Sequence, residues 1–187
     1  MPVFQHISFA GPLAELAPIS LDEMGAIRLM NRIDTKYLTN EACLVAILRD
    51  AAMAGYRVLE TEGAKISPYD SIYFDTAACK MFADHHNRRL KRQKVRTRNY
   101  VNSGTAFLEI KRKNNKGRTS KKRIAIPVGE LQDFRGDAAA CDYLSCKSWF
   151  TAADLSPSVE TLFSRITLVN PAKTERLTLD TCLSFRN

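Results

Sequence analysis

The sequence predicts an α+β protein built around an antiparallel β-barrel with flanking helices. Alternating charged and apolar residues mark at least seven strands, turn residues separate several of them, and helical patterns lie between the others. Several strands carry long side chains of one charge on one face, and unpaired cations cannot pack a dry core because burying each costs several kcal/mol. A closed barrel wide enough to hold water and an anion would place the charged positions in its lumen and the apolar positions under helices.

Residues 92–123 form the centre of this prediction, as three consecutive strands joined by hairpin turns. Alternate residues of a strand point to the same face. Turn residues stand at 102–104 and 114–117, so a meander is the simplest arrangement. One face then carries Lys94, Arg96 and Arg98 from the first strand, Glu109, Lys111 and Lys113 from the second, and Lys121 and Arg123 from the third.

The charge of this stretch is concentrated and of one sign. Residues 88–123 contain fifteen Lys or Arg and a single acid, Glu109, whereas the whole chain has a net charge of only +8. A charged strand face that is merely solvated is one interpretation. Such a face normally mixes both signs, because like charges opposite each other on neighbouring strands are destabilising. The excess therefore favours a polyanionic ligand.

The remaining elements follow from caps, periodicity and turns. The segment before Ser20 is expected to be irregular, and Ser20 with Glu23 forms a capping box that begins a short helix. Residues 31–38 repeat the alternation of charge, with Arg32, Asp34 and Lys36 on one face of a strand. We further expect helices at 41–54 (capped by Asn40), 76–86, 130–134 and 138–150, the last anchored by Trp149, and strands at 56–60, 70–74, 159–169 and 175–185.

Composition excludes several classes of protein. Five cysteines without a C-x-x-C pair indicate reduced, mostly buried thiols and neither a disulfide framework nor a zinc site. His85 and His86 are adjacent and would diverge on a helix, so they make a poor metal clamp. No apolar run reaches the roughly 20 residues of a membrane span. The first ten residues also lack the features of a signal peptide, so we expect a cytoplasmic protein.

Six strings of residues, in order, resemble the VTC domain of polyphosphate polymerases, a branch of the triphosphate tunnel metalloenzymes that also include the CYTH phosphatases. The resemblance covers about residues 28–185. It would divide the chain into an N-terminal segment with a short helix, residues 1–27, and a tunnel domain, residues 28–187. The strings are Arg32-Ile-Asp-Thr-Lys-Tyr37, Ser71-Ile-Tyr-Phe-Asp-Thr76, Lys94-Val-Arg-Thr-Arg-Asn-Tyr100, Phe107-Leu-Glu-Ile-Lys-Arg-Lys113, Lys121-Lys-Arg123 and Arg176-Leu-Thr-Leu-Asp180.

The resemblance implies an enzyme that transfers the terminal phosphate of ATP onto polyphosphate inside a basic tunnel. It also implies binding of ATP, inorganic triphosphate and polyphosphate with Mn²⁺ or Mg²⁺. Nucleic-acid binding is a weaker alternative, because Tyr100 stands nearly alone as an aromatic residue among the charged positions, so we expect no specific nucleic acid. Glu109 is the best candidate for a metal ligand, and its alternative role is that of a counter-ion for Lys111 or Arg96. Catalytic roles would fall to Lys36, Arg96, Arg98 and Lys111. The phosphate-binding set would add Lys94, Lys113, Lys121, Arg123, Arg165 and Arg176.

Two departures from the family pattern leave the activity open. Family members usually carry a further strand with a Glu-x-Lys pattern, so we expect this chain to lack the last strand or strands of the barrel. A Tyr-x-Arg pattern of the family reads Phe163-Ser-Arg165 here, without the hydroxyl. The alternatives to a polymerase are a polyphosphate-binding or triphosphate-binding module without turnover and a CYTH-like triphosphatase.

Overall fold

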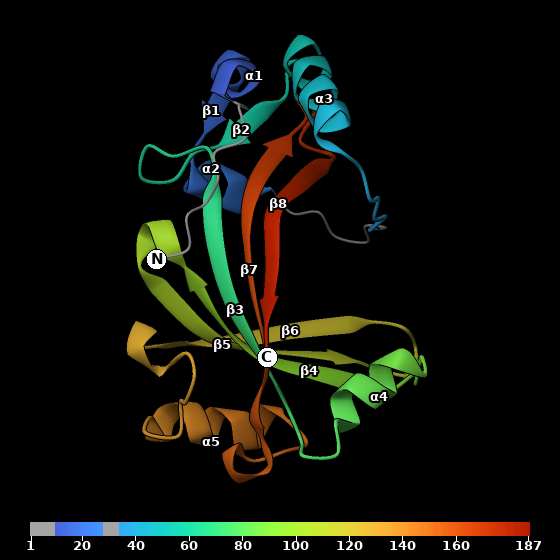
Figure 1. Cartoon of the computed structure of the whole chain (residues 1–187), viewed down its shortest axis with the longest axis vertical. Helices are drawn as coiled ribbons and strands as arrows, with labels where there is room; N and C mark the ends of the chain where they lie inside the picture. The colour runs from blue at the N-terminus through green and yellow to red at the C-terminus, as the bar shows by residue number, and fades with distance from the viewer. Residues whose placement is uncertain (1–9, 28–33) are drawn as a thin grey trace. The chain divides into compact units, whose positions relative to one another are not determined.

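A computed structural model describes residues 10–27 and 34–187, which fall into two compact units. The first unit combines the chain up to Ser67 with Ser164–Cys182, and the second combines Pro68–Phe163 with Leu183–Asn187. Helices and antiparallel strands occur in both units, which confirms the α+β class (Figure 1). Of the helices in the described residues, none combines the length and hydrophobicity that crossing a bilayer requires.

The first unit joins helices to a small sheet. Its strand order is β1-β2-β7-β8, in which β1 and β2 are parallel and β2 and β7 antiparallel. Leucines of α3 pack with Val58 of β2 and Ile166 of β7 in its core. The elements are α1 (Ala10–Glu15), β1 (Ala17–Ile19), α2 (Leu21–Ala26), α3 (Glu41–Met53), β2 (Arg57–Leu59), the second part of β7 (Ser156–Val169) and most of β8 (Arg176–Arg186).

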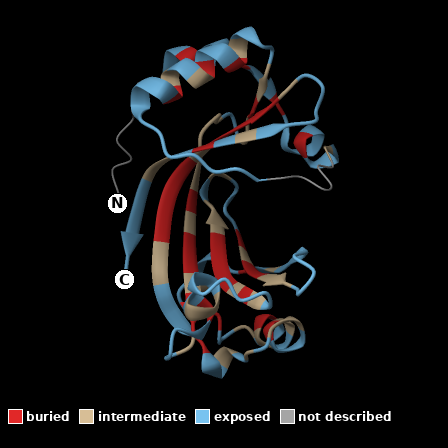
Figure 2. Cartoon of the chain, turned by 90° about the vertical axis from the view of Figure 1, so that its right-hand side faces the viewer, coloured by how far each residue is buried: buried red, intermediate tan, exposed pale blue. Residues whose placement is uncertain are grey.

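The second unit is an antiparallel sheet in the order β7-β3-β4-β5-β6. Within this unit β6 pairs with β5 alone, which leaves β6 as an edge strand. The first part of β7 is exposed from Ser156 to Ser158 and buried from Thr161 onward (Figure 2). The elements are β3 (Ser67–Asp75), α4 (Lys80–His86), β4 (Arg92–Tyr100), the 3₁₀ turn η1 (Val101–Ser103), β5 (Thr105–Lys113), β6 (Thr119–Ile126), η2 (Val128–Glu130), α5 (Ala138–Lys147) and η3 (Ala152–Asp154).

One face of the β3–β6 sheet carries the core of the second unit. Val95, Leu108 and Ile110 are almost completely buried there, together with Leu144 of α5. Burying such side chains contributes about 1.5–3 kcal/mol each. Because the side-chain period of a strand is two, this packing sends every intervening residue of β4, β5 and β6 to the opposite face.

Asp75 ends β3 and fixes the helix that follows. Its carboxylate accepts hydrogen bonds from the backbone N–H groups of Thr76, Met81 and Phe82 at 2.8–2.9 Å. These bonds satisfy N–H groups that a helix start leaves without partners. Asp75 therefore holds α4 against the end of β3, which explains why the string Ser71–Thr76 ends in an acid and a hydroxyl residue.

Most expected elements are confirmed, including the three central strands, the helix after Asn40 and the capping box of Ser20 with Glu23. Over residues 10–19, the part of it that the structure describes, the segment before Ser20 is not irregular. It forms α1, whose neighbouring leucines are buried with those of α3, and β1, which pairs with β2. Pro12 is compatible with α1 because it stands in the first turn, where a missing N–H removes no bond.

The expected strand at 31–38 is wrong over the part that the structure describes. Residues 31–33 lie outside the described residues, and Asp34 to Leu38 have no regular secondary structure. Tyr37 is 87% exposed and Leu38 fully exposed. Alternation of charge alone does not make a strand, since a strand also needs a neighbour to complete its hydrogen bonds.

The remaining helical predictions differ from the structure in their bounds. The prediction that the cysteines are mostly buried was partly wrong. The helix expected at 76–86 begins only at Lys80, because Cys79 has a left-handed backbone. The short helix expected at 130–134 is wrong, because the 3₁₀ turn η2 ends at Glu130 and residues 131–134 are not helical. The cysteines are free, as expected, but Cys43, Cys79 and Cys146 are exposed and not buried.

Candidate functional site

The pairing of β4, β5 and β6 assembles eight predicted site residues on one face, which we call the basic face. One cross-strand row reads Arg96, Glu109, Arg123, and the next reads Lys94, Lys111, Lys121. Lys113 lies one pair further along β5, and Arg98 lies beyond Arg96 on β4. The sequence-based expectation that these residues share a face is confirmed by this register. The basic face consists of Lys94, Arg96, Arg98, Glu109, Lys111, Lys113, Lys121 and Arg123.

Glu109 lies at the centre of the basic face and is fully buried. Its Oε2 accepts hydrogen bonds from Arg96 Nε at 2.8 Å and Arg96 Nη2 at 2.6 Å. Its Oε1 forms an ion pair with Lys121 Nζ. Burial pushes the pKa of the Glu109 carboxyl up, but the positive charges of Arg96 and Lys121 outweigh it and hold the pKa below its usual value. Glu109 is therefore an ionised counter-ion for Arg96 and Lys121.

Arg96 is oriented by a residue that the sequence-based reasoning missed. Its Nη1 donates to the Tyr73 hydroxyl at 3.0 Å, from the neighbouring strand β3. With the two bonds to Glu109, this contact uses three of the five N–H donors of the guanidinium. Burial raises the pKa of the Tyr73 hydroxyl, but nearby cations, chiefly Arg96, together lower it by a larger amount. The net shift of the pKa is therefore downward.

Arg98 is held by a hydroxyl and two aromatic rings. Its Nε donates to Ser71 Oγ at 2.8 Å, and its guanidinium carbon lies 5.1 Å from the ring centroid of Tyr69 and 5.5 Å from that of Phe163. The two rings are stacked on each other at 5.1 Å. Only 7% of Arg98 is exposed. These contacts fix the direction of the guanidinium without neutralising its charge.

Lys111 is a second cation without a carboxylate, and it is partly buried. Within the second unit, no Asp or Glu forms an ion pair with Arg98 or Lys111. Burial lowers the pKa of Lys111 to about 8, and repulsion from Arg96 and Lys121 adds to the effect. Arg98 and Lys111 thus lie on either side of the Arg96–Glu109 ion pair. Their positive charges are not paired with a carboxylate of the second unit.

The other cations of the basic face are more exposed. Lys121 and Arg123 of the edge strand β6 are exposed, and the guanidinium carbon of Arg123 lies 4.2 Å from the centroid of Phe107. Lys94 and Lys113 are partly buried. Burial of the cations therefore decreases from β4 toward β6.

Three predicted site residues belong to the first unit. Lys36 lies in the irregular segment and is exposed. Arg165 of β7 forms a bidentate ion pair with Asp180 of β8, with N···O distances of 2.6 and 2.7 Å. Arg176 of β8 donates to the carbonyl oxygen of Met24 at 3.3 Å.

The residues that could hold a metal ion are few. Among the described residues, no three His, Cys, Asp or Glu side chains cluster as metal ligands. Glu109 is the single acid of the basic face, and both of its oxygens face cations. As it stands, this donor set does not form a metal site, because Mg²⁺ and Mn²⁺ require several oxygen ligands.

Sequence reasoning could have found Tyr69, Ser71 and Tyr73 on the same face. They alternate along β3, and their register opposite Tyr100, Arg98 and Arg96 follows from antiparallel pairing with β4. The signal is the alternation of hydroxyl residues along β3, which begins before the string Ser71–Thr76.

The buried ion pair gives a first prediction. Glu109→Gln removes the only negative charge of the basic face and leaves the buried Arg96 without a counter-ion. We expect the free energy of unfolding in urea to fall by about 3–5 kcal/mol. The matched control is Asp133→Asn, which breaks an exposed ion pair with Arg135 and should leave stability close to that of the wild type. Equal midpoints for the two variants would contradict the role of Glu109.

The lowered pKa of Lys111 gives a second prediction. Lys111→Met should raise the melting temperature at neutral pH without ligand, because it removes a cation that folding buries beside other cations. The unfolded chain binds this proton up to a pKa near 10.5 and the folded protein only up to about 8. Wild-type stability therefore rises through that interval, and the advantage of the variant should shrink as the pH increases. Lys122→Met, on the other face of β6, is the control, and a constant difference at every pH would refute the assignment.

The comparisons with known proteins agree with this geometry. No curated protein matches the chain. The family model of the VTC domain matches residues 31–187, which include the whole basic face. VTC domains belong to the triphosphate tunnel, or CYTH-like, superfamily, which links the chain to polyphosphate-related function and to binding of polyphosphate or triphosphate. The match spans most of the chain, and the chain therefore belongs to the VTC domain family.

Proposed function

We propose that the protein is a polyphosphate polymerase that binds phosphate groups on the basic face and transfers the terminal phosphoryl group of ATP onto polyphosphate. The observation that supports this most is a pair of cations without a carboxylate partner in the second unit, the buried Arg98 and the partly buried Lys111. Burying such charges is costly unless an opposite charge joins them. A chain of phosphates would supply negative charges in a row.

The side chains suit phosphoryl transfer. This reaction requires mainly positioning of the phosphates and neutralisation of the charge on their oxygens. Arg98, directed by Ser71 and two rings, offers a planar fork to two oxygens, whereas Lys111 acts as a movable point charge. Arg96 would add its two remaining N–H donors, while Glu109 and Tyr73 keep its guanidinium in place.

The other predicted residues complete the proposal. Lys94, Lys113, Lys121 and Arg123 would contact further phosphates along the basic face. Lys36, Arg165 and Arg176 of the first unit remain proposed phosphate ligands on the strength of the family resemblance. A divalent cation, Mn²⁺ or Mg²⁺, would come as a companion of the phosphates, since such ions are often held by one or two carboxylates together with substrate oxygens.

Binding without turnover is the second candidate. It is favoured by Glu109, the single acid of the basic face, whose oxygens are both paired with cations. A protein of this kind would keep the affinity for polyphosphate and lack the carboxylates that position a metal for chemistry. A triphosphatase is the third outcome that an assay must separate.

The test is incubation with ATP and Mn²⁺, followed by gel separation of long polyphosphate from free phosphate. We expect a ladder of polyphosphate with the wild-type protein. The ladder should be lost in Arg98→Ala and Lys111→Met, because each variant removes a cation of the basic face that would contact the polyphosphate. Lys122→Met, of equal charge change, should keep the ladder.

The alternatives predict different products. Tight polyphosphate binding without a ladder would indicate the binding module, and release of phosphate from triphosphate without a ladder would indicate a triphosphatase. Polyphosphate affinity that is unchanged in Arg98→Ala and Lys111→Met would contradict a role for the basic face in any of the three.

A further inference from the structure

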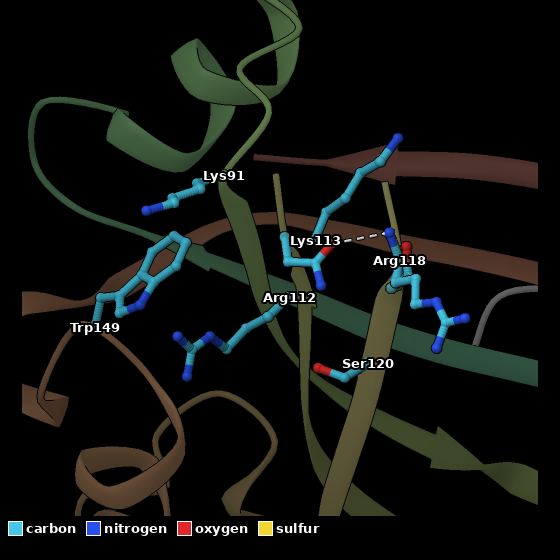
Figure 3. Close-up of a pocket in the computed structure, with 8 residues that line it drawn as sticks. Lys91, Arg112, Lys113, Arg118, Ser120 and Trp149 are labelled. Atoms are coloured by element: carbon cyan, nitrogen blue, oxygen red, sulfur yellow. Dashed lines mark hydrogen bonds between the residues drawn. The ribbon is translucent and has the colours of Figure 1, made fainter. Parts of the chain in front are cut away.

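A second basic site lies at the end of the β5–β6 hairpin and is separate from the centre of the basic face. It is a hollow of about 620 Å³ in the second unit, which we call the hairpin hollow (Figure 3). Arg112 and Ser120 alternate with the residues of the basic face and so point to the opposite side of the sheet. Only Lys113 belongs to both. The residues that matter here are Lys91, Arg112, Lys113, Arg118, Ser120 and Trp149.

The lining of the hairpin hollow is cationic. Four of its residues are Lys or Arg, and none is an acid. The turn that presents Arg118 is fixed, because Asn114 Oδ1 accepts from the backbone N–H groups of Lys116 and Arg118, both at 3.0 Å. A turn whose backbone is fixed limits where the Arg118 side chain can start and so lowers the entropic cost of binding an anion.

Trp149 adds an aromatic wall to these cations. It is the only tryptophan of the chain and is 45% exposed. We expected it to anchor the last helix by burial, but α5 ends at Lys147 and Trp149 lies against Arg112, whose guanidinium carbon is 4.8 Å from the ring centroid. Figure 3 shows both side chains beside Lys91.

The position of Trp149 is set by a buried amide. Gln93 of β4 is 2% exposed, and its Oε1 accepts from the backbone N–H of Trp149 at 3.2 Å while its Nε2 donates to Ser148 Oγ at 2.7 Å. The backbone of Trp149 is thus held in place, and its indole lies against Arg112 and is still half open to solvent. A rigid, exposed aromatic ring beside cations has the chemistry that recognises a nucleobase joined to phosphates.

We infer that the hairpin hollow binds a single nucleotide, with the base against Trp149 and the phosphates among Lys91, Lys113 and Arg118. The volume lies in the range of small-ligand pockets, about 300–1,000 Å³. Inorganic polyphosphate has no group that would use the indole. Single-stranded nucleic acid stacks successive bases on several aromatic side chains, and Trp149 is the only aromatic residue of the lining. This inference does not depend on the proposed polymerase activity.

Fluorescence of Trp149 provides the test, since the chain has no other tryptophan. ADP, which lacks the phosphate that the proposed reaction transfers, is titrated into the protein with excitation at the red edge of indole absorption. We expect saturable quenching by ADP and affinities at least about tenfold weaker for adenosine and for inorganic diphosphate, because each lacks one of the two contacts. No saturable quenching by ADP would overturn the inference.

Variants test the lining of the hairpin hollow. Arg118→Ala and Lys91→Ala should each weaken ADP binding severalfold, whereas Lys116→Ala, which removes a lysine of the same turn outside the lining, should not. In calorimetry, Trp149→Ala should weaken ADP binding about tenfold and Trp149→Phe should retain most of it, since a phenyl ring still stacks. Equal losses in Lys116→Ala and Arg118→Ala, or much tighter binding of a single-stranded oligonucleotide than of ADP, would contradict a nucleotide site.

Discussion

The carboxylate of Glu109 is the interaction on which the second unit depends. It brings one negative charge to a sheet face with seven cations, and it does so in full burial, where electrostatic interactions are strongest. Arg96 and Lys121 share this charge, one through two N–H groups and the other through its ammonium. Without Glu109, the row with Arg96 and Arg123 would hold no acid beside a row of three lysines, and like charges on neighbouring strands destabilise a sheet.

The same carboxylate also defines what remains unbalanced. It pairs with Arg96 and Lys121 and leaves Arg98 and Lys111 with charges held in position by a hydroxyl, by rings and by the strand itself. Stability and binding therefore compete at Lys111. A charge that is costly in the free protein becomes favourable when an anion arrives, which is a common arrangement at functional sites.

The sequence was most informative where the alternation of residues and the position of turn residues indicated the same strands. The strands β4, β5 and β6 could be predicted with their faces because alternation and turn residues agreed, and the basic face followed from parity. The role of Glu109 could not be settled, because a strand pattern gives its face but not its partner. The strand expected at 31–38 had alternation without a neighbour. Trp149 was expected in a helix at 138–150, but α5 ends at Lys147 and the half-exposed ring lies against Arg112.

The central claim is that phosphates bind on the basic face beside Glu109. The most direct measurement is a crystal structure with inorganic triphosphate. We predict phosphate oxygens within hydrogen-bond distance of Arg98 and Lys111, with Arg96 still paired to Glu109. Triphosphate bound elsewhere, with Arg98 and Lys111 unchanged and without a ligand, would contradict the account.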